Sequence, residues 1–274
     1  MLREPEIQRN VVPRKYSVLT ILLILSIIWI LPLFAGGNKE KGAADNQGTE
    51  AASEGSSTSG GAAAVTVTDA LGREVTVPKN PDHIICSGPG ALRLVTYLQS
   101  TEKVVAVDDM EGRRAQFDAR PYALAHPEFK ELPLFGEFRG HDNPELIVFL
   151  EPQPQVIIKT YPQMGADPLE LEQKTGIPVV SLNYGELSHN REIFYDTLRT
   201  IARILDREER AEEVIAFFER NIADLEERSS GIPEKERVSC YVGGIAYKGP
   251  HGLQSTEPGY PPFLFTKARN VAGG

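Results

Sequence analysis

The stretch from Val65 to Asp109 constrains the fold more than any other part of the chain. Two short strand patterns meet at a Leu71-Gly72 turn, and an apolar strand over 83–86 then leads through a Ser-Gly-Pro-Gly turn into a short helix. A second apolar run over 104–107 ends in two aspartates. Strands that alternate with helices, with Gly and Pro turns between them, predict an α/β fold with a parallel sheet flanked by helices. Ligands of such sheets bind beyond the carboxyl ends of the strands.

The N-terminal residues differ in character from this folded part. An uncharged apolar segment spans Val18–Ala35 and follows three basic residues, Arg9, Arg14 and Lys15. Residues 1–35 are therefore predicted to be a signal peptide or a signal anchor, and the chain is expected to be exported or membrane-inserted. The length of the segment favours an anchor. Pro32 and the small residues after Phe34 favour cleavage, which we prefer, and no cysteine follows that would support a lipoprotein anchor.

Residues 36–64 are rich in Gly, Ala, Ser and Glu and have no aromatic residue, so they are predicted to be a disordered linker. The expected location is periplasmic or otherwise extracytoplasmic, with anchoring by Val18–Ala35 left open. Lys and Arg number 29 against 38 Asp and Glu, which gives a net charge of −9. Because no basic stripe occurs, nucleic acid is not expected as a partner.

The alternation of strands and helices continues to residue 188, so 65–188 is predicted to be one α/β lobe. The expected elements are helix and loop over 110–133, a strand end at 134–136, a helix capped by Asn143, a strand over 155–159, a helix from Asp167 to Gly176 and a strand over 177–182.

The pattern changes after residue 188. His189 to Arg228 contains no Gly or Pro, and its apolar residues recur at helical spacing, with Ile193 and Leu225 among them. Residues 189–230 are therefore predicted to be two connecting helices that meet near Leu205, the second capped by a box of Asp206 and Glu209. A strand over 238–244 and a long Gly/Pro/aromatic loop over 247–262 follow, within a further segment, 231–274.

No enzyme motif or metal-binding spacing occurs in the chain, so neither catalysis nor a metal site is expected. Cys86 and Cys240 both lie in apolar strand patterns. Export makes a disulfide chemically feasible, but we expect two buried core cysteines.

Several motifs together resemble one family. Thr68 to Pro78 reads TDALGREVTVP, Asn143 to Pro152 reads NPELIVFLEP, Lys174 to Val180 reads KTGIPVV, and Asp206 begins DREERAEE. In order and spacing they resemble the periplasmic substrate-binding proteins of iron-siderophore and vitamin B12 ABC transporters. The resemblance implies two α/β lobes with parallel sheets, joined by a long helix, with the ligand between the lobes. Only the start of the second lobe, residues 231–274, is then expected in this sequence.

The resemblance implies an extracytoplasmic substrate-binding component of an ABC importer, without enzymatic activity or cofactor. Its expected partners are an ABC permease and a small-molecule metal chelate. A ferric siderophore is the first choice by family frequency, and a corrinoid or haem is an alternative. Two other classes stay open: a membrane-tethered sensor or docking domain derived from such a protein, and an enzyme that uses Cys86 or Cys240 as a metal ligand.

The candidate ligand-binding residues lie after predicted strands. The turn after the strand over 83–86 can offer backbone N–H groups, and the resemblance places it in the cleft. An aromatic and a cation follow the strand end at 134–136, types that suit an anionic chelate. The long C-terminal loop supplies further aromatic and imidazole groups. The candidates are Ser87, Gly88, Gly90, Arg93, Phe138, Arg139, Tyr161, Tyr247, His251 and Tyr260.

Two acidic features have competing interpretations. Asp108-Asp109 either faces the ligand or caps the next helix, and the cap is favoured. Glu145 complements the dipole of the helix that Asn143 begins. The resemblance also implies that Glu145 docks onto arginines of the permease.

Overall fold

The structure is a computed structural model that describes residues 63–115, 119–245, 252–257 and 259–272. The chain divides into two compact units, 1–57 and 58–274, and every described residue belongs to the second. The predicted signal segment, nearly all of the predicted linker, and Tyr247 and His251 lie outside the described residues. Within the described residues, none of the helices combines the length and the hydrophobicity that a membrane span needs.

A β-hairpin opens the described chain. Strands β1 (Ala64–Thr68) and β2 (Glu74–Pro78) pair antiparallel, as the sequence predicts. The Asp69 carboxylate accepts hydrogen bonds from the backbone N–H groups of Leu71 and Arg73 at 2.9 and 3.0 Å, which fixes the turn. The Arg73 guanidinium pairs with Asp69 and also donates to the carbonyl of Val179, so the hairpin is tied to the main sheet.

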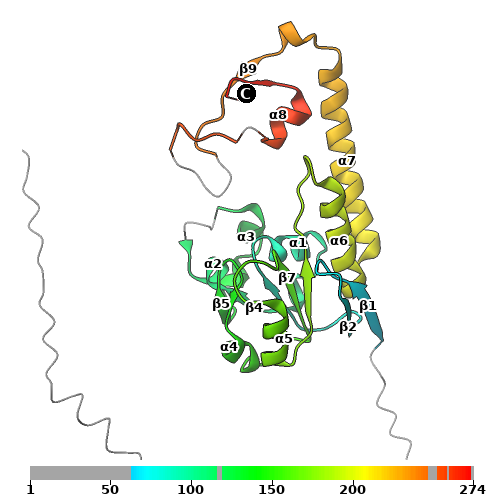
Figure 1. Cartoon of the computed structure of the whole chain (residues 1–274), viewed down its shortest axis with the longest axis vertical. Coiled ribbons are helices and arrows are strands. Elements are labelled where there is room, and N and C mark those ends of the chain that lie inside the picture. The colour runs from blue at the N-terminus through cyan, green and yellow to red at the C-terminus, as the bar shows by residue number, and fades with distance from the viewer. Residues whose placement is uncertain (1–62, 116–118, 246–251, 258, 273–274) are drawn as a thin grey trace, which may run out of the picture. The chain divides into compact units, whose positions relative to one another are not determined.

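The main sheet has six strands in the order β6-β5-β4-β3-β7-β8, and all neighbours are parallel except β5 and β6. This confirms the predicted α/β fold with a mostly parallel sheet. Figure 1 labels β4, β5 and β7 of this sheet. The strands are β3 (Ile84–Ser87), β4 (Val104–Asp108), β5 (Leu134–Glu137), β6 (His141–Asp142), β7 (Val156–Thr160) and β8 (Val179–Leu182). The chain builds outward from β3 to one edge and then returns to the other side of β3 with β7.

Helices connect and cover these strands. They are α1 (Ala91–Tyr97), η2 (Thr101–Lys103), α2 (Asp109–Gly112), α3 (Pro121–Ala125), η4 (Pro127–Glu131), α4 (Pro144–Val148), α5 (Pro168–Thr175), α6 (Arg191–Leu205) and α7 (Glu208–Ser230). Asn143 caps α4 and Asp167 caps α5, each through a side-chain oxygen that accepts two backbone N–H groups. Both helix starts confirm the sequence analysis.

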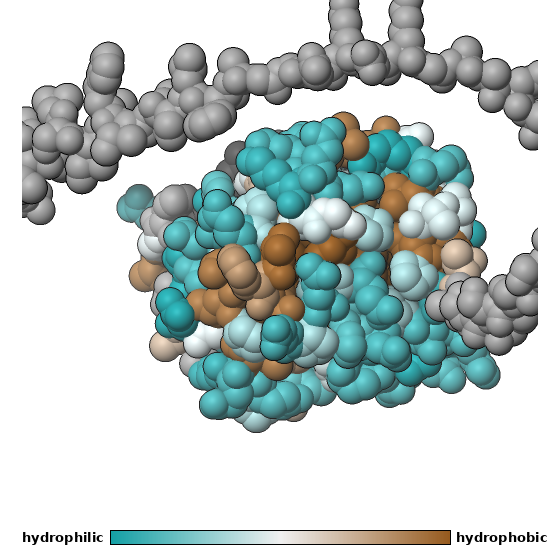
Figure 2. All heavy atoms as spheres, turned by 90° about the horizontal axis from the view of Figure 1, so that it is seen from below, coloured by the Kyte–Doolittle hydropathy of each residue, from teal (hydrophilic) through white to brown (hydrophobic). Residues whose placement is uncertain are grey.

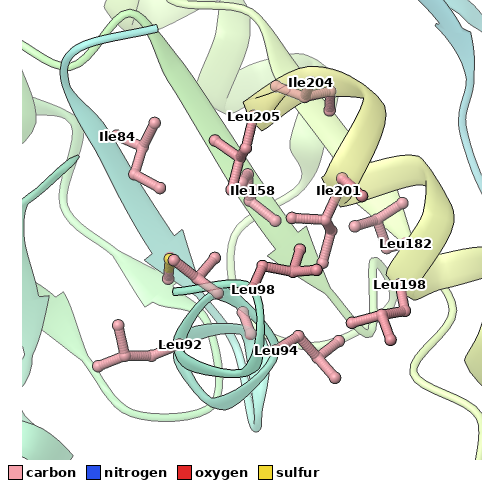
Figure 3. Close-up of a cluster of buried hydrophobic side chains, with 14 of the residues drawn as sticks. Ile84, Leu92, Leu94, Leu98, Ile158, Leu182, Leu198, Ile201, Ile204 and Leu205 are labelled. Carbon is pink, nitrogen blue, oxygen red and sulfur yellow. The ribbon is translucent and has the colours of Figure 1, made fainter. Parts of the chain in front are cut away.

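Two apolar layers sandwich the sheet because successive strand residues point to opposite faces. Ile84 and Ile158 belong to the cluster that α1 and α6 cover, whereas Ile85 and Ile157 belong to a second cluster with residues of α4 and α5. Figure 3 shows the first cluster, in which Leu198 and Ile201 of α6 gather with Leu94 of α1 and Ile158 of β7. All four side chains are fully buried. Each such burial contributes roughly 1.5–3 kcal/mol, so α6 is an integral part of this lobe.

Two helices meet near Leu205, as predicted, but the predicted capping box is wrong. Asp206 ends α6 in a left-handed conformation (φ 57°), and its carboxylate pairs with Lys79 at 2.7 Å. Arg207 precedes α7 and makes no side-chain cap. The predicted apolar stripes are also too broad, since Ile193 and Leu225 are exposed.

The C-terminal described residues contain η5 (Glu234–Glu236), β9 (Ser239–Cys240), α8 (Pro261–Thr266) and β10 (Arg269–Asn270). The strand predicted over 238–244 is therefore only two residues long, and it pairs in parallel with β10. Both cysteines are free. Cys86 is buried as predicted, but Cys240 is only half-buried because the short β9 offers it little cover.

Candidate ligand-binding site

The sheet has a topological switch point between β3 and β7, where the connections leave in opposite directions, and such points are the usual ligand sites of α/β sheets. The turn after β3 packs on the end of β7 there. The Thr160 hydroxyl donates to the carbonyl of Pro89 at 3.0 Å. A Cβ atom at Gly88 would lie 2.4 Å from the Thr160 carbonyl oxygen, and the φ of Gly88 is 81°. Close backbone approach therefore requires glycine here.

An aromatic and cationic cluster lies at the same edge of the sheet. Tyr184, just beyond β8, stacks on Tyr161, just beyond β7, with 5.6 Å between ring centroids. The guanidinium carbon of Arg93 lies 5.0 Å from the centroid of the Tyr184 ring. The same ring fills the space beside Gly90, where a Cβ atom would lie 2.3 Å from it. The fold thus brings together three predicted site residues, Gly90, Arg93 and Tyr161.

Tyr184 was missed by the sequence analysis and is the residue that joins the other three. A signal for it exists in the sequence, because it lies two residues beyond the strand of residues 179–182, much as Tyr161 directly follows its own strand. Ligands of such sheets bind beyond the carboxyl ends of the strands, so the segment after β8 is also expected to contribute side chains.

A buried ion pair links the loops beneath this edge. The Lys159 ammonium lies 2.7 Å from the Asp142 carboxylate and 3.1 Å from both the Ser87 hydroxyl and the Gly140 carbonyl. Ser87 also donates to both carboxylate oxygens of Asp142. The side chains of Lys159 and Asp142 are fully buried, as is Ser87. The Ser87 hydroxyl is therefore engaged inside the protein and does not reach the surface.

Two other predicted residues form a second cluster. The Phe138 ring lies 4.3 Å from the guanidinium carbon of Arg114 and 5.0 Å from that of Arg139. Asp109 holds this arrangement, because its carboxylate accepts the Phe138 N–H at 2.8 Å and pairs with Arg114 at 2.6 Å. Gly140, which directly follows Arg139, accepts a hydrogen bond from the Lys159 ammonium, so the buried ion pair adjoins this second cluster.

The remaining predicted site residue, Tyr260, lies at the start of α8 and packs on Phe263, with 5.9 Å between ring centroids. Among the described residues, no hydrogen bond or ring contact joins Tyr260 to either cluster. The switch-point turn itself covers a cavity of about 10 Å³, lined in part by Gly88, Gly90 and Asp108. Such a volume holds about one water, so a larger ligand would lie outside it.

Asp108 caps α2, as predicted, by accepting the backbone N–H groups of Met110 and Glu111. Glu111 is buried beside it. Its carboxylate accepts hydrogen bonds from both terminal guanidinium nitrogens of Arg120, each at 2.8 Å, and from the Tyr122 hydroxyl at 2.7 Å. Burial raises the pKa of Asp108 to about 6, and the neighbouring Glu111 charge acts in the same direction. A carboxylate in this position titrates far above its usual range.

Asp108→Asn is expected to stabilise the protein by roughly 1–3 kcal/mol at pH 7.5, because it keeps an accepting oxygen and removes a buried charge. In the wild type the folded state binds a proton between pH 4 and 6 that the unfolded state does not, so this group's contribution to stability falls as pH rises through that window. Urea unfolding at pH 4.5 and 7.5 measures the effect. A stability gain from Asp108→Asn that is the same at both pH values would contradict a raised Asp108 pKa.

Comparisons with known proteins identify the family. The sequence model of a family described as periplasmic binding protein matches residues 84–252. A curated relative, the uncharacterized ABC transporter substrate-binding lipoprotein YvrC of Bacillus subtilis (strain 168), is 22% identical over 178 residues, which cover 65% of this chain and 51% of the relative. The chain thus spans about half the length of this relative.

Solved structures show the same fold. The petrobactin-binding protein YclQ from Bacillus subtilis is 17% identical, with a TM-score of 0.53, over 77% of this chain and 68% of that chain. The molybdate periplasmic binding protein MolA of Haemophilus influenzae, solved with molybdate, is 20% identical, with a TM-score of 0.51, over 65% of this chain and 58% of that chain. The family match alone covers more than half of the sequence. The chain therefore belongs to the periplasmic binding protein family.

Proposed function

We propose that the chain is the substrate-binding component of an ABC importer, that it captures a metal chelate, and that a ferric siderophore is its cargo. Members of the periplasmic binding protein family bind substrates and are not enzymes. The observation that carries the proposal is the cluster of Arg93, Tyr161 and Tyr184 at the switch point of the sheet. Arginine and tyrosine side chains offer charge-assisted hydrogen bonds and aromatic faces, which suit an anionic chelate.

The printed names of relatives support this proposal in general terms. YvrC is described as an ABC transporter substrate-binding lipoprotein, and YclQ as a petrobactin-binding protein. MolA carries molybdate, a small oxyanion, on the same fold. The fold alone therefore does not select the cargo, and the argument for a chelate depends on the side chains. Among the described residues, no group of three or more His, Cys, Asp or Glu side chains could hold a bare metal ion.

The proposed location is extracytoplasmic. The apolar segment Val18–Ala35, preceded by basic residues, supports export, and the polar linker 36–64 would separate the folded part from the membrane. Mass spectrometry of the mature N-terminus in isolated membranes distinguishes a cleaved signal peptide from a retained anchor. A protein that stays in the cytoplasm with its first residues intact would contradict export.

The proposed permease contact is Glu145. It is exposed at the start of α4, and it lines an open groove together with Arg113 and Lys174. The exposed large apolar side chains of α4, α5 and their ends are Leu146, Val148, Phe149 and Leu169. Figure 2 views the molecule from the side where α4 and α5 lie in Figure 1 and shows apolar groups gathered between hydrophilic ones. Photo-crosslinking from position 145 should capture the permease. Capture only from α7 positions would contradict this contact.

The test of the proposed function is the melting temperature of the full chain, purified in detergent, against a ligand panel. The panel contains ferric siderophores, cobalamin, haem, molybdate and bare divalent metals. At a hundredfold excess over Kd, the bound ligand should add about 2.7 kcal/mol of stability, which raises Tm by roughly 5–10 °C for a domain of this size. A shift with ferric siderophores alone is expected. No shift with any member, from a cooperatively unfolding protein, would contradict the proposal.

A further inference from the structure

Among the described residues, Arg93 is a cation without an anionic partner. Its side chain is half-buried, and its Nε atom is buried without a hydrogen-bond partner. The guanidinium instead packs on aromatic rings: its carbon lies 5.0 Å from the centroid of Tyr184 and 5.8 Å from that of Tyr97. A guanidinium held on ring faces keeps hydrogen-bonding capacity for another molecule.

Other partly buried arginines of the same lobe are paired. Arg73 meets Asp69, Arg114 meets Asp109, and Arg120 meets Glu111, at N···O distances of 2.6, 2.6 and 2.8 Å. These three partly buried guanidinium groups each have a carboxylate partner, whereas Arg93 at the switch point has none among the described residues. An anionic group of a ligand would supply the acceptor that Arg93 lacks.

Tyr161 adds an accessible aromatic surface next to this cation. The residue is 38% exposed although its ring stacks on Tyr184. Its backbone is left-handed (φ 54°), which is uncommon for a tyrosine. Two backbone hydrogen bonds hold it there: its N–H donates to Leu182, and its carbonyl accepts from Met164. Left-handed residues other than glycine are enriched at functional sites.

Building on the proposed function, we infer that Arg93, Tyr161 and Tyr184 form a subsite for an anionic, planar aromatic donor group of the chelate, of the catecholate type. A catecholate presents two adjacent oxygens, which the fork of a guanidinium can bind, and a flat ring, which can stack on tyrosine. Three dianionic catecholates leave a ferric chelate with a net negative charge, whereas three monoanionic hydroxamates leave it neutral. The subsite therefore selects catecholate over hydroxamate chelates.

The test is calorimetric titration of the full chain with a ferric tris-catecholamide chelate and with a neutral ferric tris-hydroxamate chelate. The wild type is expected to bind the catecholamide at least about tenfold more tightly. Arg93→Gln should remove about tenfold or more of that affinity and leave hydroxamate binding unchanged. Arg220→Gln removes the same charge from an exposed position of α7 and is the matched control.

A second variant keeps the test valid if Arg93→Gln unfolds. Tyr161→Asn removes the ring and keeps a residue type that tolerates the left-handed backbone, and it should also weaken catecholamide binding selectively. Tight binding of both chelates, unaffected by either variant, would overturn the subsite and leave the proposed function standing. Binding of neither chelate would overturn both. Molybdate binding that depends on Arg93 would show an oxyanion site and overturn the aromatic preference.

Discussion

Replacing Lys159 by methionine is expected to lower the free energy of unfolding by about 3–5 kcal/mol at pH 7.5, because it leaves the Asp142 carboxylate buried without its counter-charge. Lys159 and Asp142 are 2.7 Å apart and both fully buried. The substitution would also remove the hydrogen bond from the Lys159 ammonium to the Gly140 carbonyl. The Ala166 N–H would still donate to that oxygen, at 2.7 Å. Urea unfolding measures the effect.

The expected loss depends on pH in a defined direction. Burial raises the pKa of Asp142, and the attraction of Lys159 and the Ser87 hydrogen bond only partly oppose this. Without Lys159 the carboxyl group should bind a proton in the folded state at still higher pH. The folded state of the variant then binds more protons than the unfolded state above the normal aspartate range, so the variant loses stability as pH rises. Its deficit should therefore be smaller at pH 5 than at pH 7.5.

A matched exposed pair provides the control. Lys174 and Glu170 lie 2.6 Å apart on α5, with side chains 56% and 60% exposed. Lys174→Met should change stability by less than about 1 kcal/mol, because water screens such pairs. The double variant Lys159→Met with Asp142→Asn should recover part of the loss, since no buried charge is left. Equal effects of the two lysine substitutions would contradict the importance of burial at Lys159.

The regular elements could be predicted because their signals are local. Apolar runs of four or five residues mark the strands, and the caps Asn143 and Asp167 stand directly before prolines that begin their helices. The family match over residues 84–252 confirms the resemblance found in the motifs. The Asp206 capping box failed because a cap depends on backbone conformation. Asp206 is left-handed and turns its carboxylate to Lys79, more than a hundred residues earlier in the chain.

The site was predictable only in part, since it is made of contacts between distant segments. Gly90, Arg93 and Tyr161, which were predicted from their places after strand ends, do lie together, and their role in ligand binding stays a prediction. The ion pair of Lys159 and Asp142 was missed because a lysine at the end of a strand normally indicates solvent. The burial of Lys159 follows from the register of β3 beside β7. This register places Ser87 next to Lys159.

Gly88→Ala is the other substitution with a large expected effect. The new Cβ atom would lie 2.4 Å from the Thr160 carbonyl oxygen, in a residue whose φ is 81°. The left-handed backbone costs about 1–2 kcal/mol for alanine, and the overlap with a backbone atom adds about 1–3 kcal/mol. Thr160 ends β7, which pairs with β3, so neither side can retreat without separating the strands. Unfolding in urea should show a total loss of roughly 2–5 kcal/mol.

Gly72→Ala separates the two contributions. Gly72 has nearly the same φ, 75°, but a Cβ atom there would meet nothing within 4 Å. Its substitution should cost only the backbone contribution of about 1–2 kcal/mol. In the folded fraction, Gly88→Ala should also weaken ligand binding, because the turn that it displaces leads into α1, which carries Arg93, whereas Gly72→Ala should not. Equal losses at the two positions would mean that β3 and β7 separate easily at their carboxyl ends, and a site that depends on their close approach could not then be held together.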